Sequence, residues 1–244
     1  MDAKLIGVLG GGAWGTGVAQ ALANGGHKVQ MWALEPEVKE SVNNEHENKR
    51  YLPGYKLSNN LTVSNDIVEV ATGKEFLIIA APSLYLSSTI KQIVNVPNIA
   101  DGSTVVAALT KGFVPSNDGP KLVLETIEAA LPEVYKGQTV YISGPSHAEE
   151  VAMGKLTGLI AASENPRNTI NFRELMRVPG LIVHSSLDVV GVQICAAAKN
   201  VIAIAYGRLW MGGGRTMRIT DEMIYQAAEE AAQLWLSTLP DVCD

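Results

Sequence analysis

Residues 5–15 read Leu-Ile-Gly-Val-Leu-Gly-Gly-Gly-Ala-Trp-Gly, an apolar run that leads into a glycine-rich turn. The glycines match Gly-x-Gly-x-x-Gly between a predicted strand and a predicted helix over 14–24, the context in which this motif binds a dinucleotide. We expect Gly10 to make the tight turn, Gly12 to let backbone approach a pyrophosphate, and Gly15 to let helix and strand pack closely. Free N–H groups at the helix N-terminus would complete the phosphate site. The alternative is a glycine-rich turn without a ligand.

Short apolar runs alternate with longer helical patterns along the chain, which predicts an α/β fold. Further strands are expected over 29–32, 77–81, 105–109, 140–143, 159–162 and 181–184, and helices over 84–94 and 121–131. The polar stretch 45–60 is expected to be a surface excursion with little regular structure. We therefore predict a dinucleotide-binding domain over 1–187, built on a Rossmann-type, doubly wound parallel sheet covered on both faces.

The character of the sequence changes after residue 187. Residues 189–209 are almost uninterrupted apolar and small side chains, and a helix that is apolar around most of its circumference lies inside a protein. A second, amphipathic helix is expected over 221–236. We predict that 188–244 form the start of an all-helical second domain that holds the substrate.

Bulk composition limits the classes of function. The net charge of −6 gives no basic footprint for nucleic acid. Cys195 and Cys243 are far apart and not at metal-ligand spacing, so we expect free thiols in a reducing compartment and no metal. No stretch is long and apolar enough to span a membrane, and the apolar run after the first four residues is too short for a signal peptide. The expectation is a cytoplasmic protein.

Glu35 lies about 20 positions past the glycine turn, where an acidic residue often binds the adenine ribose of NAD. Since Pro36 follows, Glu35 is equally well explained as an N-terminal residue of a helix, in a favourable position relative to the helix dipole. The choice between NAD and NADP therefore stays open.

Six segments occur in the order and spacing of one enzyme family: 10–16, 48–54, 81–83, 110–112, 143–151 and 199–205. The most specific are Asn-x-x-Tyr-Leu-Pro-Gly at 48–54 and Ser-Gly-Pro-Ser at 143–146. Over residues 5–207 the chain resembles the NAD(P)-dependent glycerol-3-phosphate dehydrogenases of the bacterial type. That family reduces dihydroxyacetone phosphate to sn-glycerol 3-phosphate, the backbone precursor of glycerophospholipids.

The resemblance implies roles for individual residues. Lys199 would be the catalytic residue, and Asn200 either hydrogen-bonds the substrate or caps a neighbouring group. The substrate would contact Lys111, Gly144, Ser146, Lys199 and Asn200, and the cofactor, NAD or NADP, would contact Gly10, Gly12, Ala13, Trp14, Gly15, Lys111 and Ala148.

The residue chemistry agrees with these roles. Reduction of a carbonyl by hydride needs a proton donor, and a lysine partly desolvated by an apolar helix, as Lys199 is, suits acid–base exchange. Its alternative is a lysine that extends out of a buried helix. Lys111 follows a predicted strand at the carboxyl end, where open α/β sheets bind ligands; its alternative is a surface lysine. The turn 143–146 offers donors to an oxyanion or is an ordinary turn, and His147 is interpreted as a loop histidine.

The chain departs from the family after Tyr206. The arginine–asparagine pair that binds the substrate phosphate in the family is not found there, so the chain is C-terminally short or divergent. Either a second subunit, as in a homodimer, covers the apolar surface of 189–209, or the chain is truncated. The alternative function is a dinucleotide-binding protein with little or no catalysis. A dehydrogenase of 3-hydroxy acids is a weaker option, which the segment 48–54 disfavours.

Overall fold

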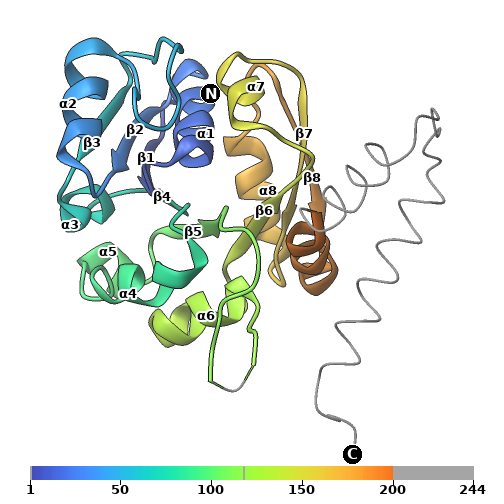
Figure 1. The fold of residues 1–244 in the computed structure, drawn as a ribbon. Helices are drawn as coiled ribbons and strands as arrows, with labels where there is room; N and C mark the ends of the chain where they lie inside the picture. The colour runs from blue at the N-terminus through green and yellow to red at the C-terminus, as the bar shows by residue number, and fades with distance from the viewer. Residues whose placement is uncertain (1, 118, 200–244) are drawn as a thin grey trace, which may run out of the picture.

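The computed structural model describes residues 2–117 and 119–199 (Figure 1). The predicted helix 221–236, most of the predicted helix 189–209, and Asn200 lie outside the described residues. Residues 189–199 are helical, as expected. The division into domains at residue 187 stays a prediction.

An eight-stranded sheet with the order β3-β2-β1-β4-β5-β6-β7-β8 forms the centre of the fold (Figure 1). All neighbouring strands are parallel except β6 and β7. The predicted Rossmann-type sheet is therefore confirmed. The strands are β1 (Leu5–Leu9), β2 (Lys28–Trp32), β3 (Leu61–Ser64), β4 (Phe76–Ile79), β5 (Val105–Ala108), β6 (Val140–Ser143), β7 (Thr157–Ala162) and β8 (Leu181–Ser186).

Two apolar cores sandwich the sheet, one on each face. Buried side chains of α1, α2, α7 and α8 form the first core with alternate residues of the strands, such as Ile6 and Val8. Buried side chains of α3, α4 and α6 form the second core. Leu9 belongs to this core, and Val192 packs against it. The helices are α1 (Ala13–Asn24), α2 (Pro36–Glu45), α3 (Ile67–Ala71), α4 (Leu86–Lys91), α5 (Pro97–Ala100), α6 (Val123–Ala130), α7 (Ala148–Ala152) and α8 (Pro166–Leu175).

The predicted parallel arrangement does not extend to the pair β6 and β7, which is antiparallel. A parallel connection must cross the sheet, usually through a helix on one face. Here the short helix α7 packs beside α1 instead, and a Cβ at Gly17 of α1 would lie 2.8 Å from the carbonyl oxygen of Ala148. The chain therefore enters β7 at the edge of the sheet where β6 ended.

The carboxyl ends of β1, β2, β4, β5 and β6 all meet at one edge of the sheet, because these strands are mutually parallel. The glycine turn follows β1, Lys111 follows β5, and Gly144 follows β6. Ligands of open α/β sheets bind at this edge. Within the described ranges, no helix has the length and apolar character needed to cross a bilayer.

Candidate dinucleotide and substrate site

The glycine turn has the geometry that its pattern predicts. Gly10 has a φ of 141°, which residues other than glycine rarely adopt. A Cβ at this position would lie 2.7 Å from the Ala80 backbone. A Cβ at Gly15 would lie 2.1 Å from the carbonyl oxygen of Gly10, so only glycine lets the helix approach so closely. At Gly12 an added Cβ would meet nothing within 4 Å. Gly12 is the N-cap residue of α1, and no side chain caps the first N–H groups of this helix.

The segment 48–54 is attached to the glycine turn through Asn48, which is fully buried. Its Nδ2 donates to the carbonyl oxygen of Gly11 at 2.9 Å and to Oγ1 of Thr16 at 2.8 Å. Its Oδ1 accepts from the Tyr51 backbone N–H at 3.1 Å. The role of this side chain is therefore structural, since it fixes both the turn and the backbone at Tyr51.

Replacement of Asn48 by alanine is expected to destabilise the protein by about 2 kcal/mol, because it removes buried hydrogen bonds and leaves the Gly11 carbonyl oxygen without its donor. Urea unfolding followed by circular dichroism measures the change. The control is Asn59→Ala at an exposed position, which should leave the midpoint unchanged. Equal midpoints for both variants would contradict this role of Asn48.

Lys111 contacts the indole of Trp14, the second residue of α1. The Lys111 Nζ atom lies 5.0 Å from the centroid of the Trp14 ring, within the range of a cation–π contact. Thr110 fixes the backbone beside it, since its hydroxyl donates to the carbonyl oxygen of Ala81 at 2.8 Å. Burial, and secondarily the charge of Lys199, lower the pKa of Lys111 below its usual value. The two lysines are therefore close enough for their charges to interact.

Lys199 reaches this region from the last described helix. Its Nζ atom donates to the carbonyl oxygen of Ser146 at 3.2 Å. Ser146 is buried, and its backbone N–H donates to the carbonyl oxygen of Gly144 at 2.9 Å, which closes a tight turn after β6. The Trp14 Nε1 atom is buried and has no hydrogen-bond partner among the described residues. Segments up to 185 residues apart in sequence thus bring Trp14, Lys111, Ser146 and Lys199 together.

A hollow of about 390 Å³ lies between the turn after β6 and the helix 189–199, with Lys199 in its wall. A Cβ at Gly144 would lie 2.4 Å from the carbonyl oxygen of Gly158, so this turn needs glycine to lie against β7. The wall is mainly apolar apart from Lys199, Asp188 and Ser143. Its lining residues are Ser143, Gly144, Pro145, Ile160, Asp188, Gly191, Val192, Cys195, Ala196 and Lys199.

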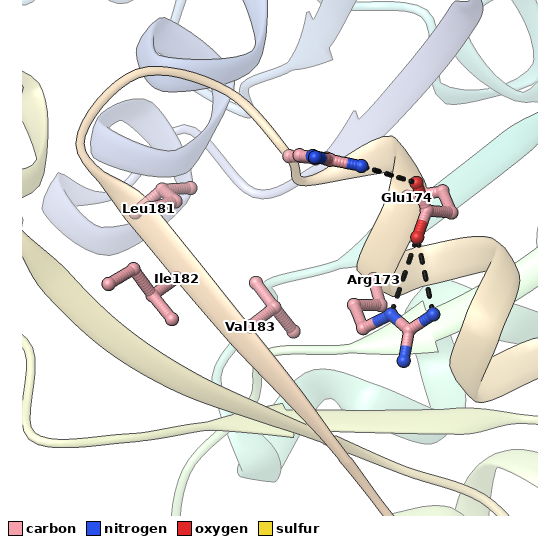
Figure 2. A pocket seen from close by; sticks show the side chains of 6 residues that line it. Arg173, Glu174, Leu181, Ile182 and Val183 are labelled. Carbon is pink, nitrogen blue, oxygen red and sulfur yellow. Dashed lines mark hydrogen bonds and ion pairs between the residues drawn. The ribbon is translucent and has the colours of Figure 1, made fainter.

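A second hollow lies against α8 and β8, but its charged side chains are already paired (Figure 2). Glu174 contacts the guanidinium of Arg173 at 3.3 Å and that of Arg177 at 3.6 Å. Because β8 is an edge strand, four strands separate this hollow from β1 and the glycine turn. It therefore contributes nothing to the site.

The sequence matches a known family across most of the domain just described. The family model described as the N-terminus of NAD-dependent glycerol-3-phosphate dehydrogenase matches residues 5–169. The chain belongs to this family. The match includes the glycine turn, the segment 48–54, Lys111 and the turn after β6, whereas Lys199 lies beyond it.

Relatives extend the likeness further along the chain. Glycerol-3-phosphate dehydrogenase [NAD(P)+] of Treponema denticola is 47% identical over 210 residues, which are 84% of this chain and 59% of that protein. The enzyme of the same name from Treponema pallidum is 46% identical over 213 residues. The chain thus spans about 60% of the length of these relatives. The crystal structure of glycerol-3-phosphate dehydrogenase from Coxiella burnetii superposes with a TM-score of 0.82 at 29% identity, covering 96% of this chain and 69% of that one.

The dehydrogenase-family residues predicted from sequence fall into two groups in the structure. Gly10, Gly12, Ala13, Trp14 and Gly15 form the turn and the start of α1, and Lys111, Ser146 and Lys199 converge beside Trp14. Ala148 begins α7 and lies against Gly17 in the second turn of α1. His147 is the N-cap residue of α7 and makes no side-chain cap. The individual binding roles stay predictions.

Proposed function

We propose that this chain reduces dihydroxyacetone phosphate to sn-glycerol 3-phosphate with NADH or NADPH, in the cytoplasm, and so supplies glycerophospholipid synthesis. The observation that carries the proposal is the convergence of Lys111 and Lys199 beside Trp14, at the end of the glycine turn. The names of the Treponema relatives support the same activity. A homodimer stays a prediction.

The described residues fit a dinucleotide well. The open space at Gly12 and the uncapped N-terminus of α1 suit a pyrophosphate, since free N–H groups and the positive end of the helix dipole face it. The unpartnered Nε1 atom of Trp14 lies in the first turn of the same helix. No group of three or more potential metal-ligating side chains gathers in the described part of the chain, and none is needed for this reaction.

Lys199 has the chemistry of a proton donor to the substrate. A bound nicotinamide would supply the hydride, which adds to the carbonyl carbon of the substrate. The carbonyl oxygen then needs a proton, and the Lys199 ammonium has three N–H donors, of which one is directed at the Ser146 carbonyl oxygen. A second N–H can therefore point at the substrate oxygen and transfer its proton.

Lys111 supplies positive charge for the phosphate groups. Its contact with the Trp14 ring orients the Nζ atom, and the anchored Thr110 backbone limits its movement. A half-buried ammonium attracts an anion more strongly than an exposed one, because the surrounding medium screens less. We therefore expect Lys111 to contact both the cofactor and the phosphorylated substrate.

Binding of sn-glycerol 3-phosphate in the presence of NADH is expected to weaken at high pH. Because the pKa of Lys111 is lowered, its charge is lost at a lower pH than in an ordinary lysine. Affinity is therefore full below this pKa and declines as the pH rises through it. Calorimetric titration over a pH series measures the decline, and Lys111→Arg should move it to higher pH because arginine keeps its charge. An unshifted profile would contradict the assignment.

The direct test of the proposed function is oxidation of NADH or NADPH in the presence of dihydroxyacetone phosphate, compared with unphosphorylated dihydroxyacetone. We expect kcat/KM to favour the phosphorylated substrate by about 100-fold or more, since charge-assisted contacts to the phosphate are lost with the smaller ketone. Cofactor binding without turnover of either ketone would overturn the proposed reaction and favour a dinucleotide-binding protein without catalysis.

A further inference from the structure

Glu35 lies three residues past the end of β2, at the edge of the sheet next to the glycine turn. Its backbone is the N-cap of α2, yet its side chain makes no capping hydrogen bond. Instead its Oε1 atom accepts from the hydroxyl of Tyr51 at 2.6 Å. The helix-start explanation of Glu35 is thus correct for its backbone, while its carboxylate is directed toward the segment 48–54.

Both ends of the Glu35–Tyr51 contact are fixed. The Asn65 Nδ2 atom donates to the carbonyl oxygens of Ala33 and Glu35, at 2.7 and 3.2 Å, and so holds the backbone after β2. Asn48 holds the backbone N–H of Tyr51 and, through the same side chain, the glycine turn. The carboxylate is therefore preorganised relative to the turn, and Oε2 has no partner among the described residues.

The arginine that contacts Tyr51 is already engaged. Arg50 forms an ion pair with Glu37, and its guanidinium lies over the Tyr51 ring at 5.2 Å from the centroid. An arginine near the end of the second strand is what accommodates the 2′-phosphate of NADP in Rossmann folds. Here two carboxylates, Glu35 and Glu37, accompany it, so the position after β2 carries net negative charge.

We propose that Glu35, positioned by Tyr51, makes the adenosine end of this site selective for NAD(H) over NADP(H). The carboxylate accepts a hydrogen bond from the 2′-hydroxyl of the adenine ribose and repels a phosphate at the same position. This inference rests on the proposed function only in that the glycine turn binds a nicotinamide dinucleotide. It specifies which of the two cofactors the turn receives.

The test is the ratio of the Kd for NADPH to the Kd for NADH, measured by nicotinamide fluorescence without substrate. Glu35→Gln keeps the shape and an acceptor for Tyr51 but removes the charge, and Glu40→Gln removes the same charge from an exposed position of α2. Tyr51→Phe removes only the hydroxyl that positions Glu35. Competition by adenosine 5′-phosphate and by its 2′-phosphorylated counterpart confines the readout to the adenosine end.

We expect the protein to prefer NADH by about 10- to 100-fold, the range in which one unfavourable charge contact acts. Glu35→Gln should lower this ratio about tenfold and Tyr51→Phe about threefold, while Glu40→Gln leaves it within about twofold. The 2′-phosphorylated competitor should gain affinity in Glu35→Gln only.

Three results would overturn the proposal. The first is equal affinity of the unmodified protein for both cofactors, and the second is an unchanged ratio in Glu35→Gln. The third is an about tenfold loss of NADPH affinity in Arg50→Ala. That result would mean that Arg50 binds the 2′-phosphate. If neither cofactor binds, the dinucleotide site itself is refuted, which is a distinct outcome.

Discussion

Lys199→Met is expected to lower kcat for reduction of dihydroxyacetone phosphate by about 10³-fold, within the range that general acid catalysis contributes. Methionine fills a similar volume but carries no proton, so the alkoxide that forms at the substrate oxygen would have no donor. The Kd for NADH should stay within about threefold, because the glycine turn and α1 bind the cofactor independently of this side chain. Stopped-flow absorbance at the nicotinamide band measures the rate.

Lys199→Arg distinguishes the effect of the positive charge of this side chain from the effect of its proton transfer. Arginine keeps the positive charge but does not release a proton at working pH. We expect KM to recover toward its original value while kcat stays low. Lys155→Met is the matched control, since Lys155 is exposed and forms an ion pair with Glu150 at 3.5 Å. A Lys199→Met variant with kcat within tenfold of the parent would refute the role of Lys199 as proton donor.

Gly12→Ala is expected to lower NADH affinity by about 10- to 100-fold with little change in stability. The added methyl group meets no protein atom within 4 Å, and the backbone at Gly12, with φ of −68° and ψ of 174°, is open to alanine. The methyl group would instead occupy the space in which a pyrophosphate approaches the backbone, and each tenfold loss corresponds to about 1.4 kcal/mol. Fluorescence titration and thermal unfolding measure the two effects.

Gly15→Ala is the counterpart of this variant. Its methyl group would lie 2.1 Å from the carbonyl oxygen of Gly10, so the turn must distort. We expect a loss of about 1–3 kcal/mol of stability, as for other overpacked positions. If Gly12→Ala destabilised the protein as much as Gly15→Ala and bound NADH normally, the space at Gly12 would have no binding role.

The sequence alone predicted the elements that depend on local chemistry. The glycine turn follows from three glycines at fixed spacing, and β1, β4, β5 and β6 follow from apolar runs that fit strands buried on both faces. The convergence of Lys111 and Lys199 was expected only through resemblance to a family. No local pattern indicates that residues 88 positions apart share one site.

Other features depend on tertiary contacts and were not predicted from the sequence. Only Val38, Ser41 and Val42 of α2 are buried, so its sequence carries a weak apolar pattern. The four residues of β3 are too few to show alternation. The reversed direction of β7 depends on packing of α7 against α1. The Tyr51–Glu35 hydrogen bond joins two motifs that were interpreted separately, and it is visible only when the segment 48–54 is placed over the turn.

A crystal structure of the complex with NADH tests most directly whether the glycine turn and Lys199 form one site. We predict pyrophosphate oxygens within hydrogen-bonding distance of the backbone N–H groups at the start of α1, and the nicotinamide ring on the same side of the sheet as the Lys199 Nζ atom. A pyrophosphate bound elsewhere, or a nicotinamide separated from Lys199 by the sheet, would contradict it.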